Sequence, residues 1–244
     1  MKRQLFKDVR FERSNTPAHV TASPACAHAF ELPQELGSGN LATVWKGCRP
    51  AKPPEIKQDC DYAVKISLVT DKPELSGRVR LEYLGEDIYT QSRKEFRREV
   101  DIATKAGEMH IGPKVIEEWI CPEPVYIDDH LEVDFQLGFI VMQKLDISLQ
   151  QWMRRFPSKI VDHREALFNE AYRKIATLHK MDVVHTDIRG DNIMLQLDSN
   201  NNPTGLYLVD FGVAEPISPH SRRGEQQKEE DMDALSETFG AEVG

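Results

Sequence analysis

The sequence predicts an α+β protein whose first half is built from strands and one main helix and whose second half is mostly helical. Strand-like runs predict five strands in the first half, near residues 31–38, 42–48, 61–68, 114–121 and 136–144. Two main amphipathic helices are expected. One begins near Ser92, and the other carries Leu167, Ala171, Ile175 and Leu178 on its apolar face. With 244 residues, of which 40% are hydrophobic, the chain can form one or two domains with a substantial core.

The first two strands flank a glycine-rich turn within residues 36–44, Leu-Gly-Ser-Gly-Asn-Leu-Ala-Thr-Val. Gly37 and Gly39 would let backbone N–H groups approach phosphate oxygens with no Cβ in the way. The pattern Gly-x-Gly-x-x-Ala also matches the dinucleotide-binding fingerprint, but that motif must open a helix. Here the chain continues as a strand through Trp45, so we interpret the turn as a phosphate-binding loop of another kind.

A single lysine, Lys65, lies inside the apolar third strand. A buried ammonium group needs a partner, and Glu99 is the candidate because it falls on the inward face of the helix that begins near Ser92. Ser92 and Glu95 form a Ser-x-x-Glu capping box at the start of this helix. Glu95 is the alternative partner for Lys65, although the capping box already uses its carboxylate.

The run His185-Thr186-Asp187-Ile188-Arg189-Gly190-Asp191-Asn192, followed by Asp210-Phe211-Gly212, carries the main chemical signal. Phosphoryl transfer needs a group that orients the attacking hydroxyl and oxygen ligands that hold Mg²⁺ against the nucleotide phosphates. Asp187 suits the first task, and Asn192 and Asp210 suit the second.

These motifs, taken together, resemble those of the eukaryotic-type protein kinases over roughly residues 31 to 240. The resemblance implies a bilobal protein-kinase-like fold, with an antiparallel β-sheet N-lobe that carries one main helix and a shortened, mostly helical C-lobe. It divides the chain into an N-terminal extension (1–29), an N-lobe (30–145) and a C-lobe (146–244). It also implies ATP and Mg²⁺ as cofactors and a protein substrate.

The resemblance assigns a role to each residue of the site. Lys65 would hold the α- and β-phosphates and pair with Glu99, while Asp187 would accept or orient the proton of the substrate hydroxyl. Asn192 and Asp210 would bind Mg²⁺, and Arg189 stands where the family usually has a catalytic-loop lysine. Met142 would lie at the entrance to the pocket behind the nucleotide, and backbone groups of residues 143–145 would contact the edge of the adenine ring. The nucleotide-binding set is Gly37, Ser38, Gly39, Val44, Ala63, Lys65, Met142, Gln143, Leu145 and Met194.

The sequence departs from the kinase pattern at three places. Thr186 replaces the arginine of His-Arg-Asp, Arg189 replaces a lysine with a planar cation, and no Ala-Pro-Glu follows Gly212. The run that starts at Asp231 resembles the beginning of the central C-lobe helix, whose leading aspartate braces the catalytic loop. The short C-lobe resembles that of minimal kinases such as those of large DNA viruses, and a protein partner could complete its surface.

Composition agrees with an intracellular enzyme. The net charge of −9 and the sequence pI of about 5.4 argue against nucleic acid as a partner, and no run approaches the roughly 20 apolar residues of a membrane span. The four cysteines have no metal-binding spacing, so we expect free thiols in a reducing, cytoplasmic compartment, which is the host cell if the protein is viral. Residues 49–59 read as an enlarged hairpin loop and residues 69–91 as an insertion.

Three functional classes remain open. The sequence favours an ATP- and Mg²⁺-dependent protein kinase that acts on Ser or Thr, with Tyr as the less frequent acceptor because an arginine at the position of Arg189 also occurs in tyrosine kinases. The second class is a small-molecule phosphotransferase of the aminoglycoside or choline kinase type, which usually lacks the glycine-rich turn and the Asp-Phe-Gly. The third is an inactive kinase fold that serves as a binding module, which the intact set of candidate residues disfavours.

Overall fold

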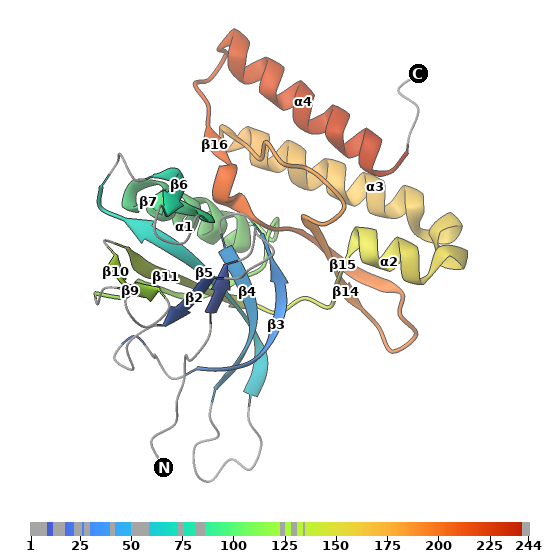
Figure 1. The fold of residues 1–244 in the computed structure, drawn as a ribbon. Helices are drawn as coiled ribbons and strands as arrows, with labels where there is room; N and C mark the ends of the chain where they lie inside the picture. The colour runs from blue at the N-terminus through green and yellow to red at the C-terminus, as the bar shows by residue number, and fades with distance from the viewer. Residues whose placement is uncertain are drawn as a thin grey trace. The chain divides into compact units, whose positions relative to one another are not determined.

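The computed structural model describes residues 9–11, 18–21, 26, 30–39, 42–49, 59–72, 76–81, 86–122, 125–127, 131–133 and 135–240. The chain divides into two compact units (Figure 1). Unit 1 comprises Met1–Val100 and Val115–Lys144, and unit 2 comprises Asp101–Lys114 and Leu145–Gly244. The division after residue 144 lies one residue from the predicted lobe boundary, while residues 101–114 group with the second unit.

The main sheet of unit 1 contains the five strands that the sequence predicts. In spatial order they are β3 (Glu31–Ser38), β4 (Ala42–Arg49), β5 (Asp59–Thr70), β11 (Gln136–Gln143) and β8 (Val115–Ile120), and every neighbouring pair is antiparallel. Their positions agree with the predicted runs. β4, β5 and β11 carry the buried residues of the sheet, whereas β3 is mostly exposed and β8 is partly exposed. The predicted loop at residues 49–59 lies almost wholly outside the described residues.

The N-terminal extension and the insertion before α1 both add strands to unit 1. A small antiparallel sheet has the order β1 (Val9–Phe11), β2 (Ala18–Thr21), β9 (Val125–Ile127) and β10 (Leu131–Val133). The predicted insertion forms the hairpin of β6 (Gly77–Leu81) and β7 (Glu86–Ser92), and the end of β7 runs parallel to the end of β5. The chain therefore enters α1 (Arg93–Glu108) directly from a strand bonded to the main sheet.

Apolar side chains cover both faces of the main sheet. On one face, Phe96 and Val100 of α1 pack with Val69 and Ile140. On the other, a second cluster is built from strand residues together with Cys26 and Phe30 from the N-terminal side of β3. Burial on both faces explains why β5 reads as a continuous apolar run rather than an alternating one.

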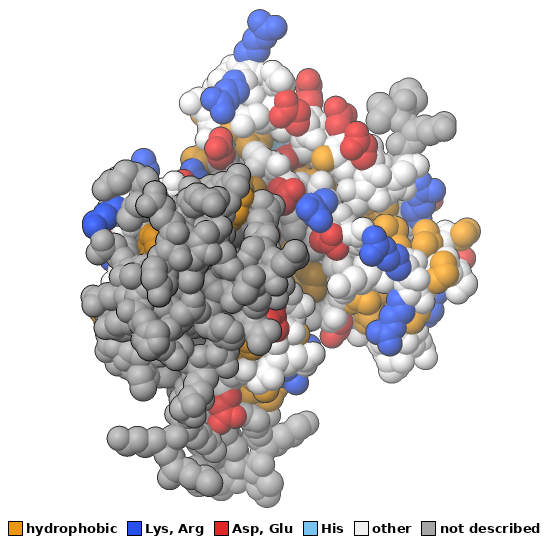
Figure 2. Space-filling view, viewed as in Figure 1, with side chains coloured by type: hydrophobic (Ala, Val, Ile, Leu, Met, Phe, Trp, Pro, Cys, Tyr) orange, Lys and Arg blue, Asp and Glu red, His pale blue; other side chains and the backbone are white. Residues whose placement is uncertain are grey.

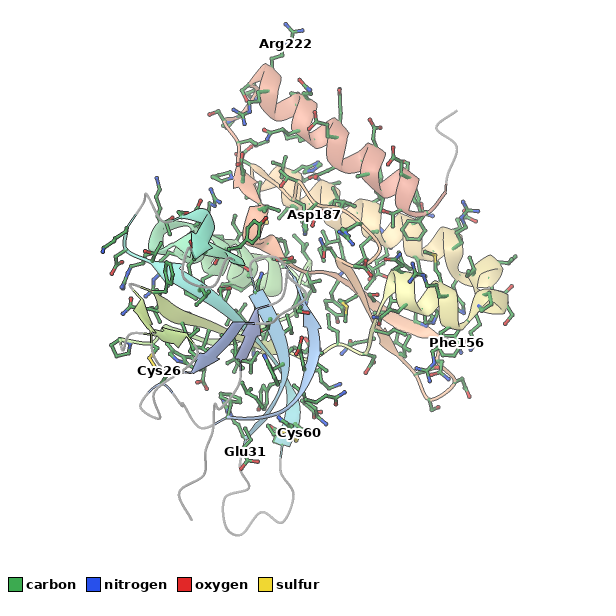
Figure 3. All side chains as sticks on the ribbon, viewed as in Figure 1. Cys26, Glu31, Cys60, Phe156, Asp187 and Arg222 are labelled. Carbon is green, nitrogen blue, oxygen red and sulfur yellow. A yellow bond between two sulfur atoms is a disulfide. The ribbon has the colours of Figure 1, made fainter. Side chains whose placement is uncertain are left out.

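All four cysteines are paired, so the expectation of free thiols is wrong. Cys48 and Cys60 face each other across β4 and β5, with Cα atoms 4.0 Å apart, and Cys26 is bonded to Cys121, with Cα atoms 5.2 Å apart. Figure 3 labels Cys26 and Cys60. Spacing could not reveal these pairs, because sheet register creates one and a separation of 95 residues spans the other. The cytoplasmic location, which rested partly on free thiols, stays a prediction.

Unit 2 is mostly helical around one apolar core. Its elements are β12 (Ile147–Ser148), α2 (Leu149–Arg155), α3 (Pro157–Lys180), β13 (Val183–Val184), β14 (Ile193–Leu197), β15 (Pro203–Leu208), the 3₁₀ turn η3 (Phe211–Val213), β16 (Glu215–Pro216) and α4 (Arg222–Thr238). The predicted apolar face of α3 is confirmed, since Leu167, Ala171, Ile175 and Leu178 are all buried.

The last helix begins earlier than expected. The sequence placed its start near Asp231, whereas α4 starts at Arg222, because the Ser221 side chain caps it by accepting a hydrogen bond from the Gly224 amide. Figure 2 shows acidic side chains along α4. The exposed ones are Glu225, Glu229, Glu230, Asp233 and Glu237, which form the solvent face of the helix. No helix among the described residues is long and apolar enough to span a membrane.

Candidate active site

Lys65 and Glu99 form a buried ion pair in unit 1. Lys65 Nζ donates to Glu99 Oε1 at 2.5 Å, and the two residues are only 6% and 2% exposed. The helix periodicity that put Glu99 on the inward face is therefore confirmed. Glu95, the alternative partner, accepts hydrogen bonds from the backbone amide and hydroxyl of Ser92, each at 2.7 Å, so the capping box is confirmed as well.

Strand register places the predicted nucleotide-binding side chains of β4, β5 and β11 on one face of the sheet. Val44 lies opposite Lys65, and Ala63 lies opposite Met142. Because residues two apart in a strand share a face, all four side chains project to the same side. This is also the side on which α1 packs, since Ile140 lies opposite Lys65 and belongs to the same apolar cluster as Phe96.

The glycine-rich turn leaves open space above its first glycine. A Cβ added at Gly37 would meet no heavy atom within 4 Å, and Gly37 and Ser38 pair with Val44 and Thr43. The Gly39 amide closes the turn by donating to the carbonyl of Ala42 at 2.9 Å. Among the described residues, none lies against the side-chain position of Gly37.

The backbone that follows Met142 is partly committed to the sheet. Gln143 pairs with Tyr62 at the end of β11, and the amide of Lys144 donates to the carbonyl of Asp61 at 3.0 Å. The Lys144 amide is therefore not available to an adenine ring. Of the segment predicted to meet adenine, the backbone groups of Gln143 and Leu145 remain as candidates.

In unit 2, Asn192 holds Asp187 in place. The Asn192 side-chain amide donates to Asp187 Oδ2 at 2.7 Å and to its backbone carbonyl at 2.9 Å. The Asn192 carbonyl accepts a hydrogen bond from the amide of Val209, the residue before Asp210, and His185 Nε2 donates to the Val209 carbonyl at 3.0 Å. These bonds bring the loop of Asp187 and the segment of Asp210 together at one end of the β14–β15 hairpin. Figure 3 labels Asp187.

A buried carboxylate braces this loop, as the sequence suggested for Asp231. Its oxygens accept hydrogen bonds from the backbone amides of His185 and Thr186, both at 2.8 Å, and from His179 Nε2 at 2.9 Å. Burial raises the pKa of Asp231, but these three donors outweigh it and hold the pKa below its usual value. Burial lowers the pKa of His185, and the charge of Asp231 only partly opposes this, so His185 is neutral near pH 7.

Thr186 connects the loop of Asp187 to the segment after Gly212. Its hydroxyl donates to the carbonyl of Val213 at 2.8 Å, and next to it β13 pairs with β16. The Ile217 amide donates to the carbonyl of Asp182 at 2.8 Å. Thr186 and Asp210 both have φ near +64°, a strained conformation for residues with a side chain. The hydrogen bonds around Thr186 hold this conformation in place.

Arg189 is paired within its own loop. Its guanidinium donates to Asp191 Oδ2 at 2.8 Å, and this contact raises the pKa of Arg189. The remaining predicted residues of unit 2 take ordinary places: Leu145 is buried, and Met194 is half-buried in β14, where it pairs with Tyr207.

Residues 30–234 match the family model of the protein kinase domain. The chain belongs to the protein kinase superfamily. No match is found among curated proteins. The match covers the bilobal architecture that the sequence predicts and supports phosphotransfer in general.

A kinase of this family would bind Mg²⁺ together with nucleotide phosphates, and the residues present fit that use. In the described part of the chain, no group of three or more His, Cys, Asp or Glu side chains is arranged to hold a metal by itself. Mg²⁺ in such sites takes one or two protein ligands and completes its shell with phosphates and water. Because the Asn192 nitrogen donates to Asp187, its carboxamide oxygen remains as a ligand for a cation.

Three residues with a part in the kinase site were not found from the sequence. Gln91 donates to Glu99 Oε2 at 2.9 Å, Asp191 pairs with Arg189, and His179 bonds to Asp231. Asp191 could have been noticed, because it lies two residues from a cation in the catalytic loop. His179 gave no signal because its contact with Asp231 joins elements far apart in the sequence. Gln91 gave none because its contact with Glu99 depends on the pairing of β7 with β5.

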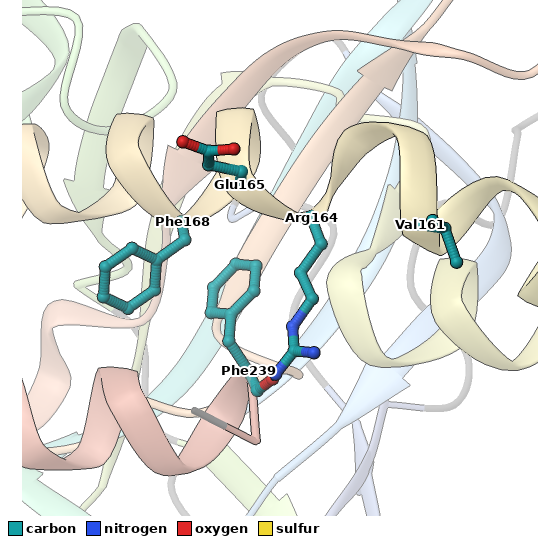
Figure 4. A pocket seen from close by; sticks show the side chains of 5 residues that line it. All are labelled: Val161, Arg164, Glu165, Phe168 and Phe239. Carbon is teal, nitrogen blue, oxygen red and sulfur yellow. The ribbon is translucent and has the colours of Figure 1, made fainter. Parts of the chain in front are cut away.

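A separate hollow lies on unit 2 between α3 and the end of α4 (Figure 4). It has a volume of about 280 Å³ and is lined by Val161, Arg164, Glu165, Phe168 and Phe239. The rings of Phe168 and Phe239 meet edge to face with centroids 5.6 Å apart. No residue of the predicted kinase site lines it.

Proposed function

We propose that this chain is an ATP- and Mg²⁺-dependent protein kinase that transfers the γ-phosphate to Ser or Thr hydroxyls of protein substrates. The observation that carries the proposal is the Asp187–Asn192 hydrogen bond of 2.7 Å, because it orients a carboxylate toward its task while leaving an oxygen of Asn192 for a cation. Membership of the kinase superfamily supports phosphotransfer. The acceptor residue and the two cofactors are the finer part of the proposal.

Each unit would supply a distinct part of the reaction. In unit 1, Lys65 would bind the α- and β-phosphates with its ammonium group held by Glu99, and the apolar side chains of Val44, Ala63 and Met142 would contact the nucleotide base.

In unit 2, Asp187 would accept a hydrogen bond from the substrate hydroxyl and take its proton as the phosphoryl group moves. When bound, Mg²⁺ would supply positive charge that offsets the charge on the phosphates. Asn192 and Asp210 would hold it.

Two alternatives make different predictions about the acceptor. A small-molecule phosphotransferase would label an aminoglycoside or choline, and it is disfavoured because the glycine-rich turn and the Asp-Phe-Gly are both present. An inactive binding module would label nothing. It is disfavoured because Lys65, Glu99, Asp187, Asn192 and Asp210 are all present, and Lys65 and Glu99 are paired as phosphoryl transfer requires.

The test is transfer of label from γ-labelled ATP with Mg²⁺ to a panel of proteins, aminoglycosides and choline, followed by phosphoamino-acid analysis. We expect label on protein Ser or Thr with the wild-type chain and none with Asp187→Asn. Label that appears only on a small molecule would overturn the proposal in favour of the second class. Label on Tyr would change the acceptor and leave the kinase assignment in place.

A protein partner that covers the short C-lobe stays a prediction, as do the absence of nucleic-acid and membrane partners and the intracellular location. A direct check of location follows from the cysteines. Disulfides are typical of oxidising compartments, so the redox state of Cys26 and Cys48 in protein isolated from its source would distinguish a reducing from an oxidising compartment.

A further inference from the structure

The carboxylate of Glu99 has two buried partners, one of which the kinase motifs do not include. Lys65 donates to Oε1, and the side-chain amide of Gln91 donates to Oε2 at 2.9 Å. All three residues are buried, with exposed fractions of 6% for Lys65 and 2% for Glu99 and Gln91. Each oxygen of Glu99 is therefore held by a separate donor, which fixes the rotation of the carboxylate as well as its position.

Gln91 is delivered to Glu99 by the insertion that precedes α1. Its strand, β7, runs parallel to the end of β5, with Gln91 opposite Val69. α1 starts only two residues later, so Gln91 and Glu99 are joined by a short, regular path of one strand end and two helical turns. A swing of α1 away from the sheet would have to break the Gln91 contact as well as the Lys65 contact.

The start of α1 is fastened to the same region by further bonds. Ser76, from the turn before β6, donates to the capping carboxylate of Glu95 at 2.6 Å. The guanidinium of Arg93 donates to Asp71 at 2.9 Å and to Gln136 of β11 at 2.7 Å. The insertion thus adds contacts at the first turn of the helix and one, through Gln91, at the catalytic glutamate itself.

Burying the Gln91 side chain is energetically unfavourable, and packing alone does not explain why a glutamine stands here. Its amide oxygen is buried and has no hydrogen-bond partner among the described residues. An unsatisfied buried carbonyl is unfavourable, and an apolar side chain of the same shape would avoid it. A glutamine at this position is useful because its nitrogen reaches Glu99 without adding a second charge to the ion pair.

We propose that Gln91 is a positioning residue that holds Glu99 against Lys65, so that the β6–β7 insertion keeps the ion pair assembled without an external signal. The inference rests on the proposed kinase function and concerns how the activity of that kinase is regulated. In protein kinases the Lys–Glu pair must be in place for phosphoryl transfer, and positioning of the helix that bears the glutamate is a usual point of control. Here the contacts of Gln91 would keep the Lys65–Glu99 pair in place at all times.

Two nearly isosteric substitutions test this role. Gln91→Met removes the donor and keeps the volume, so we expect catalytic efficiency with ATP to fall at least tenfold while the melting temperature stays within a few degrees of wild type.

Gln91→Glu places two carboxyl groups side by side, and such a pair retains a shared proton at low pH. The proton restores a hydrogen bond to Glu99, so the activity of this variant relative to wild type should fall as pH rises from 6 to 9. Gln136→Met is the matched control, because it removes a glutamine bonded to α1 through Arg93 rather than Glu99, and it should stay within threefold of wild type.

Phosphotransfer rates are measured against ATP concentration and pH for the four proteins, together with binding of a fluorescent ATP analogue in the absence of acceptor. A relative activity of Gln91→Glu that declines with pH, with Gln136→Met flat, supports the proposal. Wild-type kinetics and binding in both Gln91 variants across this range would overturn it. Gln91→Glu serves as the test if Gln91→Met does not fold. An inactive wild-type chain would instead overturn the kinase function, and the binding assay would still report on Gln91.

Discussion

Unit 1 and unit 2 hold their reactive side chains by different means. In unit 1 the key group is one end of a buried ion pair, in which Lys65 comes from β5 and Glu99 from α1. A disulfide between Cys48 and Cys60 also links β5 to its neighbour β4. In unit 2 the key group lies on a loop whose backbone amides are bonded to one buried carboxylate, Asp231. All four cysteines belong to unit 1, and unit 2 relies on its apolar core.

Under the proposed function the difference has a reason in each unit. A surface that binds a nucleotide would need charge at a defined point, which a paired lysine supplies. A loop that carries the reactive carboxylate would need a fixed backbone so that Asp187 and Asn192 keep their relation, and backbone hydrogen bonds to Asp231 of α4 provide this. Substitutions in unit 1 and in unit 2 should therefore affect different properties of the protein, as the following predictions describe.

The largest expected effect is on catalysis from unit 2. Asp187→Asn should lower the rate of phosphotransfer by about 10²–10⁴-fold, the usual contribution of a general base, while ATP affinity stays nearly unchanged. Asp191→Asn, in the same loop, is the control and should cost less than tenfold, since its carboxylate is bonded to Arg189. Steady-state rates and a direct nucleotide-binding assay measure both quantities, and wild-type turnover from Asp187→Asn would remove Asp187 from the site.

A second effect, on stability, should be confined to unit 1. Loop lengths of 12 and 95 residues predict stabilisation of about 3 and about 5 kcal/mol from the two disulfides in the chain-entropy model. Reduction, or paired Cys→Ser substitutions, should therefore lower the unfolding midpoint reported by Trp45 and Trp119 more than that reported by Trp152 of unit 2. The fluorescence of single-tryptophan variants gives the measurement. Reaction of all four cysteines with a thiol reagent in the native, unreduced protein would contradict the pairing.

Acid should weaken unit 2 through His185. Burial places the pKa of His185 below that of a free histidine, about 6.5. The unfolded chain therefore binds a proton below about pH 6.5 that the folded chain does not bind. The free energy of unfolding should fall by at most about 1.4 kcal/mol per pH unit from this group as pH drops from 6.5 toward 5.

Asp231, whose folded pKa is depressed, contributes stability that is present above its unfolded pKa, about 3.9, and is lost as pH falls through its folded value. The pH 5–6.5 window therefore reports on His185 and not on Asp231. Denaturant unfolding followed at Trp152 should show a shallower pH slope in His185→Gln than in wild type. Equal slopes would mean that His185 is not held neutral in the folded state.

The smallest expected effect concerns loop phosphorylation. Thr186 offers no positive charge to a phosphate, and its hydroxyl already holds the segment after Gly212 through Val213. Ser218→Ala and phosphatase treatment should therefore change activity less than twofold, with control of the enzyme left to its abundance or to a partner. Ser221 is better left intact in this test because it caps α4. A tenfold or greater loss, reversed by phosphorylation of Ser218, would show that the segment is regulated in the usual way.

Local features could be predicted from the sequence because they depend on neighbours in the chain. The strands, the Ser92–Glu95 capping box and the inward direction of Glu99 all follow from short-range spacing. The register of β7 beside β5 and the Cys26–Cys121 pair could not be predicted, because both depend on contacts that form only once the fold exists. The start of α4 is a local feature that the sequence does carry, because Ser221 is a standard helix cap. The prediction was wrong because it relied on the resemblance of the run at Asp231 to the start of a kinase helix.

The most direct test compares one variant from each unit in the same assay. Lys65→Met removes a phosphate ligand and leaves Glu99 without its cation, which can cost about 3–5 kcal/mol of stability for a buried pair. We predict that it lowers the melting temperature without ATP and nearly abolishes the shift that ATP and Mg²⁺ produce. Asp187→Asn should keep that shift and lose turnover. An unaltered ATP-induced shift in Lys65→Met would place the nucleotide elsewhere and contradict the account.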